Sequence, residues 1–232
     1  MQLTTQDQHI LYSATTFRLL LDSLARPGKI NRLEYPRRLG NPPSFYSQTL
    51  SMDVSVNFYA LGALLTLLDG EVSFVVAANA QWQPSTSPVV QWLVLRSNAS
   101  VAKSESADFA FFCDDKSAGM ITHLNSGTLL EPEESTTVFY CVEQLADMSD
   151  TIVDLDGDDE WLTLELSGPG IRTQNIVHVA GLDMAEIEYI NATRCNYPLG
   201  IDVYLVDVLG RCVGLPRTTR IQISVLVRQV RG

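Results

Sequence analysis

The sequence predicts an α/β protein in which a mixed β-sheet is flanked by helices. Apolar residues recur at helical spacing in several segments, and β-branched and aromatic runs have the length of strands. The helices fall mainly in the first half and before a terminal hairpin, which indicates a sheet with both parallel and antiparallel strands, covered by helices on its faces. With 232 residues, 46% of them hydrophobic, the chain can bury a sizeable core, and we expect one domain over residues 1–232.

The predicted helices lie at residues 15–25, 57–68, 88–96 and 185–193. The first carries apolar residues from Phe17 to Leu24 at the spacing of an amphipathic helix. Thr15 or Thr16 can cap its start, and Pro27-Gly28 stops it.

The predicted strands are residues 72–77, 109–113, 137–142, 161–167, 175–179, 203–208 and 221–227. A turn at Leu209-Gly210 joins the strand at 203–208 to a short run at 212–215, as in a β-hairpin. Residues 80–87 and the acidic stretch 147–160 are predicted to be loops. Exposed strand edges invite association, so we predict that the strand at 221–227 is a pairing surface.

The composition argues against several classes of partner. A formal net charge of -11 and a pI of about 4.6 give a field that repels nucleic-acid phosphates and anionic lipid surfaces. No apolar run approaches ~20 residues, the length that spans a membrane, and the first residues form no basic or apolar targeting segment. We therefore expect a cytoplasmic protein with no nucleic-acid or membrane partner.

The spacing of ligand-type residues does not favour a metal site. The four cysteines form no C-x-x-C pair and are predicted to be buried free thiols, and no histidine has a His or Cys partner at zinc-ligand spacing. Asp154, Asp156 and Asp158 alternate as calcium ligands do, but the stretch lacks the glycine and glutamate pattern of an EF-hand loop. We favour a solvated loop there over a calcium site.

One candidate site for an anion or an acidic partner follows the terminal hairpin. Arg217, Thr218 and Thr219 offer a guanidinium and two hydroxyls, which suit an oxyanion or a carboxylate. Alternatively, Arg217 pairs with a carboxylate such as Asp202, and the threonines line a strand end.

A second candidate is a basic island at residues 29–39 of this acidic chain. Its Arg32, Arg37 and Arg38 suit an anion or an acidic surface, although a solvated loop is the favoured interpretation. Gly168-Pro169-Gly170 completes no phosphate-binding motif and is predicted to be a turn between strands. Because no nucleophile elbow, zinc-protease helix or cysteine with a basic partner is visible, we predict no catalytic residue in this chain.

Several motifs follow one another in a fixed order across nearly the whole chain. They are Phe17-Arg18-Leu19-Leu20 with Arg26-Pro27-Gly28, Leu64-Leu65-Thr66-Leu67-Leu68-Asp69, Gly127-Thr128-Leu129-Leu130-Glu131-Pro132-Glu133, Leu166-Ser167-Gly168-Pro169-Gly170-Ile171, and Tyr197-Pro198-Leu199-Gly200-Ile201-Asp202 with Pro216-Arg217-Thr218-Thr219. In this set and order the chain resembles the PhnH family, the H subunits of the bacterial carbon–phosphorus lyase core complex of phosphonate breakdown. The acidic stretch 147–160 and residues 225–232 look like additions to the family pattern.

The resemblance implies a fold similar to the large domain of pyridoxal-phosphate-dependent transferases. Those enzymes need a lysine amine for their Schiff base. The chain's lysines, Lys29, Lys103 and Lys116, each lie in a polar, loop-like context. The resemblance therefore implies a relative without the cofactor lysine, and we expect no cofactor. A transferase relative that holds a cofactor through arginines is a further alternative.

The resemblance also implies a role. It implies a non-catalytic scaffold or regulatory subunit that works with the G, I and J subunits, supporting formation of ribose 1-alkylphosphonate 5-triphosphate from ATP and an alkylphosphonate, and a homodimer in isolation. In that family the radical cleavage of the C–P bond belongs to the J subunit, and this chain has no iron–sulfur cluster motif. The alternative is a phosphonate- or nucleotide-binding protein or enzyme with an arginine-based anion site.

Overall fold

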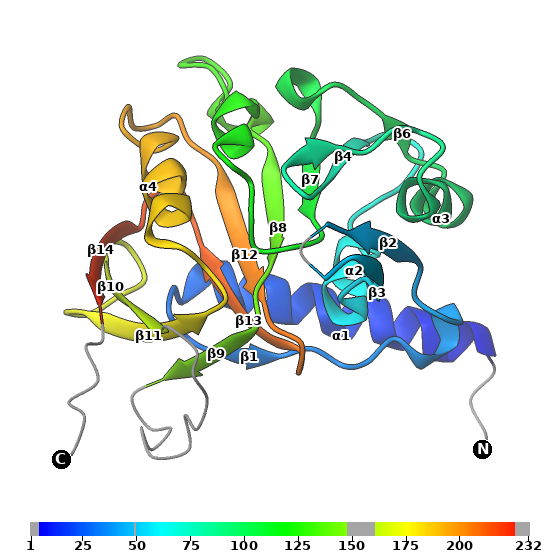
Figure 1. The fold of residues 1–232 in the computed structure, drawn as a ribbon. Coiled ribbons are helices and arrows are strands. Elements are labelled where there is room, and N and C mark those ends of the chain that lie inside the picture. Colours follow the sequence, from blue (N-terminus) through cyan, green and yellow to red (C-terminus); the bar gives the residue numbers. More distant parts are fainter. Residues whose placement is uncertain (1–4, 49, 148–160, 226–232) are drawn as a thin grey trace, which may run out of the picture.

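A mixed β-sheet forms the centre of the computed structural model, which describes residues 5–48, 50–147 and 161–225 (Figure 1). Its parallel core consists of β4 (Ser73–Ala78), β7 (Phe109–Phe112), β8 (Thr137–Cys141) and β12 (Asp202–Val206). The antiparallel strand β13 (Arg211–Leu215) pairs with β12, and β1 (Asn31–Arg32) pairs antiparallel with β13 at the sheet edge. At the other end, β5 (Gln81–Trp82) pairs antiparallel and β6 (Ser100–Val101) pairs parallel with β4. The predicted mixed sheet is confirmed.

Helices cover one face of this sheet. They are α1 (Thr5–Ala25), α2 (Phe58–Leu65) and α3 (Pro88–Ser97). Leu20 of α1, Leu61 of α2 and Phe111 of β7 belong to one buried apolar cluster. The same side carries the hairpin of β2 (Ser44–Ser47) and β3 (Met52–Ser55) and the 3₁₀ helix η1 (Arg37–Leu39).

A second sheet covers the other face. Its antiparallel strands are β14 (Arg220–Val225), β10 (Trp161–Ser167), β11 (Asn175–Ala180) and β9 (Gln144–Asp147), and α4 (Met184–Ala192) lies on the same side (Figure 1). Tyr140 and Leu205 of the first sheet share a buried cluster with Leu164 and Ile187. On this face the predicted helical cover is only α4, and the second sheet, which the sequence did not predict, packs beside it.

Helix α1 begins at Thr5 rather than at residue 15. No Gly or Pro interrupts the segment, so nothing in the backbone stops the helix before Thr15 or Thr16. Thr16 is buried inside the helix rather than capping its start. The helix lies directly on β13, because an added Cβ at Gly214 would come within 2.5 Å of the Ser23 carbonyl carbon.

The other predicted elements lie close to their expected places. β10 has the predicted bounds, and α2 begins after Asn57, whose side chain accepts a hydrogen bond from the Ala60 backbone N–H at 3.2 Å. The short strands β1, β2, β3, β5, β6 and β9 were not predicted, and neither were the 3₁₀ helices η1, η2 (Ser104–Ser106), η3 (Met120–His123) and η4 (Pro132–Glu134).

The calcium alternative at Asp154–Asp158 lies outside the described residues. No helix in the described parts of the chain has the length and apolar character needed to cross a membrane.

Candidate functional site

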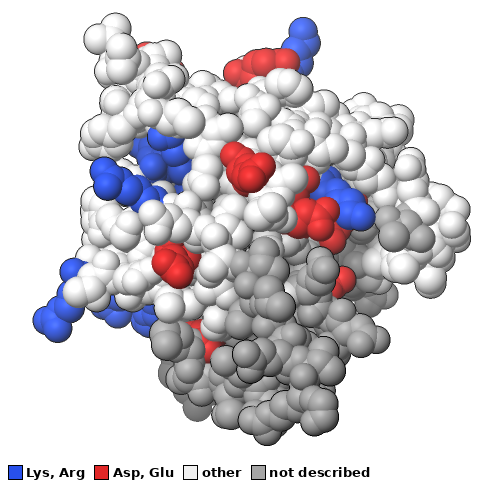
Figure 2. Space-filling model, turned by 60° about the vertical axis from the view of Figure 1, so that its left-hand side comes forward, with Lys and Arg blue, Asp and Glu red and all other residues white. Residues whose placement is uncertain are grey.

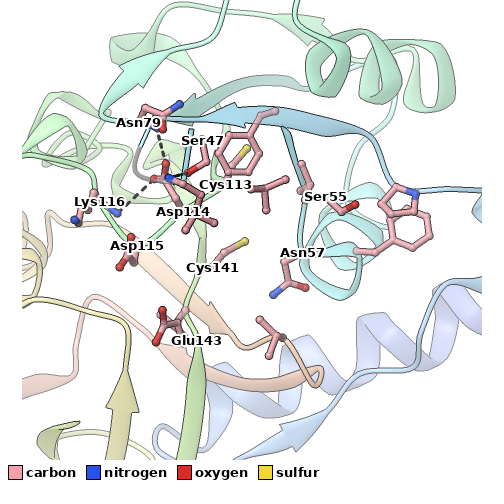
Figure 3. A pocket seen from close by; sticks show the side chains of 18 of the residues that line it. Ser47, Ser55, Asn57, Asn79, Cys113, Asp114, Asp115, Lys116, Cys141 and Glu143 are labelled. Atoms are coloured by element: carbon pink, nitrogen blue, oxygen red, sulfur yellow. Dashed lines mark hydrogen bonds between the residues drawn. The ribbon is translucent and has the colours of Figure 1, made fainter. Parts of the chain in front are cut away.

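A cleft of about 760 Å³ lies at the carboxyl ends of the parallel strands (Figure 3). We call it the sheet-edge cleft. β4, β7 and β8 end there and lead into Asn79, residues 113–116 and Glu143, and Ser47 and Asn57 complete the polar lining. Ligands of open α/β sheets bind at this edge. The sequence did not reveal the cleft, because its polar residues come from segments far apart in the chain.

Acidic side chains dominate the charge of the sheet-edge cleft. Asp114, Asp115 and Glu143 line it together with one cation, Lys116. Asp114 accepts a hydrogen bond from the Asn79 backbone N–H at 2.5 Å. Burial raises the pKa of both Asp114 and Asp115 above the ordinary aspartate value. Three carboxyl groups and one amine line the cleft, so its ionisable side chains are mainly acidic.

The thiols of the sheet-edge cleft are not prepared for nucleophilic chemistry. Cys113 and Cys141 are buried and free, as predicted, whereas Cys195 is exposed. Burial raises the pKa of both cleft thiols, and the nearby Asp114 raises it further. Because the thiolate is the nucleophile, a raised pKa makes a cysteine inert. No histidine lies in the described lining to activate either thiol.

The lining of the sheet-edge cleft does not fit pyridoxal phosphate. The exposed Lys116 borders the cleft, but a phosphate group would face three carboxyl groups and no arginine in the described lining. The absence of a cofactor stays a prediction. The alternative of a cofactor held by arginines has no arginine to use in this part of the described structure. The described residues also contain no group of three or more His, Cys, Asp or Glu side chains that could hold a metal ion.

The structure brings the predicted Arg32, Arg37 and Arg38 together around one pocket of about 710 Å³. The pocket lies against the N-terminal half of α1, and Glu34 shares its lining. All three arginines are exposed to solvent, which fits the favoured interpretation of a solvated segment. A binding role for them stays a prediction.

The predicted Arg217, Thr218 and Thr219 line a hollow of about 610 Å³, together with Arg194 and Arg220. We call it the arginine hollow. Figure 2 looks at the side of the molecule where α4 and β14 lie and shows basic side chains gathered around a hollow. Arg194 follows α4, and the other four residues lie in the β13–β14 connection or at the start of β14. The sequence did not predict Arg194 or Arg220 as members of the site.

Arg217 does not use its guanidinium to pair with Asp202. Its backbone N–H donates to Asp202 Oδ1 at 2.7 Å, whereas its guanidinium donates to the Pro132 carbonyl oxygen and to Ser135 Oγ. The predicted contact with Asp202 therefore exists, but it leaves the guanidinium charge without a carboxylate among the described residues.

The turn at Gly168-Pro169-Gly170 borders the arginine hollow. It joins the antiparallel strands β10 and β11, so the predicted turn between strands is confirmed. Gly168 has φ +133°, and an added Cβ would lie 2.8 Å from the Thr218 carbonyl oxygen. Glycine therefore allows the turn to approach the Thr218 backbone closely.

The described elements define an α/β protein with an acidic cleft at the sheet edge and a basic hollow near the terminal strands. The chain belongs to the PhnH family, because a family model described as "Bacterial phosphonate metabolism protein (PhnH)" matches residues 5–222. The resemblance in the sequence motifs is confirmed.

Two curated relatives are described as subunits. The chain is 27% identical over 215 residues, 92% of each chain, to "Alpha-D-ribose 1-methylphosphonate 5-triphosphate synthase subunit PhnH" of Rhizobium meliloti (strain 1021). It is 31% identical over 98 residues, 42% of this chain and 43% of the relative, to "Putative C-P lyase subunit protein HtxG" of Stutzerimonas stutzeri. Members of this family are therefore subunits of complexes in phosphonate metabolism.

Proposed function

We propose that the chain is a non-catalytic subunit of a cytoplasmic complex that breaks down phosphonates. In this complex it works with the G, I and J subunits and supports formation of ribose 1-alkylphosphonate 5-triphosphate from ATP and an alkylphosphonate. The observation that carries the proposal is the similarity over 92% of both chains to a relative described as a subunit of the corresponding methylphosphonate synthase.

The chemistry of the described residues supports a non-catalytic role. The thiols in the sheet-edge cleft are inert because their pKa values are raised, and no histidine lies beside them. His178 forms a hydrogen-bonding contact with Thr163 at 3.1 Å across β10 and β11, away from the cleft. Chemistry would then be supplied by partner subunits.

An apolar stripe on α1 is the surface we assign to a partner subunit. Ile10, Ala14, Phe17 and Leu21 are all exposed and follow the i, i+4, i+7, i+11 spacing of one helix face. The opposite side of the helix faces the core with Leu19 and the buried Thr16 and Ser23. In Figure 1, α1 runs along one side of the molecule, where another chain can reach it. An apolar stripe of this kind marks an interaction site.

A homodimer in isolation remains part of the proposal. β14 lies at the edge of the second sheet, as the predicted pairing surface requires. Residues 226–227 of the predicted strand lie outside the described residues. Charge-reversing substitutions on β14 that leave the isolated protein dimeric would remove this edge from the proposal.

Co-expression with the partner subunits tests the subunit role. An affinity-tagged G subunit is expected to retain this chain together with the I and J subunits at constant stoichiometry through size-exclusion chromatography. Control cells express the chain with the untagged subunits. A tagged complex of G, I and J that assembles without the chain, while the folded chain elutes separately, would contradict the proposal.

A further inference from the structure

We propose that the arginine hollow binds a phosphate-type dianion, the terminal group that phosphate monoesters and phosphonates share. The inference rests on the proposed function for the choice of this ligand class. It deepens that function by giving the subunit a site for the substrate class of its complex. The geometry of the hollow supports an anion site independently.

The charge of the hollow is the first observation. Arg194, Arg217 and Arg220 line it, and its described lining contains no Asp or Glu, in a chain whose formal net charge is -11. None of the three forms an ion pair within the described residues. Burial lowers the pKa of Arg194 to about 10, which leaves its guanidinium charged at neutral pH. Asp202 lies close enough to raise the pKa of Arg194, but the three guanidiniums outnumber this one carboxylate. Their net positive charge favours an anion in the hollow.

Two buried polar atoms without partners are the second observation. Thr219 is only 2% exposed, and its Oγ1 has no hydrogen-bond partner in the described structure. The Nε of Arg194 is likewise buried and without a partner there. Buried polar groups are nearly always hydrogen-bonded, so each exception needs an explanation. Both residues line the hollow, where ligand oxygens can accept the missing hydrogen bonds.

The guanidiniums are held in place by neutral groups. Arg194 Nη2 donates to the Leu215 carbonyl oxygen at 2.7 Å, and Arg217 Nη1 donates to Ser135 Oγ at 2.7 Å. These contacts fix the orientation of the side chains without cancelling their charge. Because these side chains are already ordered, they lose less conformational entropy when a ligand binds. Arg220 is exposed at the start of β14, opposite Ser167 of β10.

The sheet-edge cleft is the competing location, and its charge disfavours the same ligand. Asp114, Asp115 and Glu143 face Lys116 there, whereas the hollow presents only cations. A dianion is repelled by the first site and attracted by the second. The arginine hollow therefore suits a phosphonate better than the sheet-edge cleft, although ligands of α/β sheets usually bind at the sheet edge.

Isothermal titration calorimetry on the full chain tests the site, with methylphosphonate and inorganic phosphate as separate probes. Arg220→Gln removes a positive charge and Thr219→Val removes a hydroxyl donor, so each is expected to weaken binding of the dianion by about tenfold. Arg172→Gln is the matched control, because Arg172 is exposed on the adjoining β10–β11 turn and does not line the hollow. Thr219→Val should unfold at no lower urea concentration than the parent, because the hydroxyl has no hydrogen bond in the described structure to lose.

Tighter binding of methylphosphonate assigns the site to phosphonates, and tighter binding of phosphate assigns it to phosphate esters. Both results support the dianion site. It is overturned if neither probe binds at millimolar concentration, or if Arg172→Gln weakens binding as much as Arg220→Gln. Arg220→Gln could instead leave the binding of both probes unchanged and prevent co-purification with the partner subunits. The hollow would then contact a carboxylate of a partner subunit, and the dianion proposal would be wrong. Assembly of the wild-type complex is scored separately, so failure of the anion site and failure of the subunit role give different results.

Discussion

Replacing Phe17 and Leu21 together by glutamate is expected to abolish co-purification of the chain with its partner subunits. The two side chains are 45% and 51% exposed and lie on the apolar stripe of α1. A partner that covers the stripe would then bury two carboxylates in an apolar interface, which is strongly unfavourable when they have no counter-charge. The affinity should fall by at least about a hundredfold.

The matched control is Leu95→Glu, because Leu95 is 82% exposed on a different helix, α3. The single variant should assemble as the parent does. Circular dichroism of both variants checks that the fold is kept, and analytical ultracentrifugation shows whether the isolated double variant changes its oligomeric state. A folded double variant that still joins the complex would exclude the stripe as the docking surface. Loss of a homodimer alone would assign the stripe to a second copy of the chain.

Replacing Glu186 by alanine is expected to cost on the order of 4 kcal/mol of unfolding free energy, because several buried donors lose their acceptor at once. Glu186 is 4% exposed on α4 and accepts hydrogen bonds from the backbone N–H groups of Ser117 and Ala118, each at 3.0 Å. It also accepts from Ser117 Oγ and, at 2.8 Å, from the Tyr140 hydroxyl. The carboxylate therefore ties α4 to β8 and to the segment after β7.

Urea denaturation measures this loss, with Glu188→Ala as the control, since Glu188 is exposed on the same helix. Glu186→Gln should be less damaging than Glu186→Ala, because its amide oxygen can still accept from the two backbone N–H groups. A loss below about 1 kcal/mol for Glu186→Ala would show that the network contributes little.

The elements that depend on local pattern could be predicted from the sequence. In β10, Leu162, Leu164 and Leu166 alternate with more polar residues, and the structure gives the strand its predicted bounds. The second sheet was not expected as a covering layer, because the pairing of β9, β10, β11 and β14 is set by contacts between distant segments. The early start of α1 was missed because Thr15 or Thr16 was taken as its N-cap, whereas the helix runs through both residues and Thr16 is buried within it.

The candidate sites could likewise be predicted only where their residues are adjacent in the sequence. Arg217, Thr218 and Thr219 were found because they are adjacent in the sequence, and the structure places them in one hollow. Arg194 is separated from them by β12 and β13, so only the fold reveals its place there. The carboxylates of the sheet-edge cleft were missed for the same reason, because they meet only where separate strands end.

Adenine release from ATP and methylphosphonate tests the central claim most directly. The rate is measured for the purified partner subunits with this chain, for the same subunits without it, and for the chain alone. A non-catalytic subunit predicts full activity only when the chain joins the complex and no release by the chain alone. Release by the chain alone, or equal rates with and without it, would contradict the account.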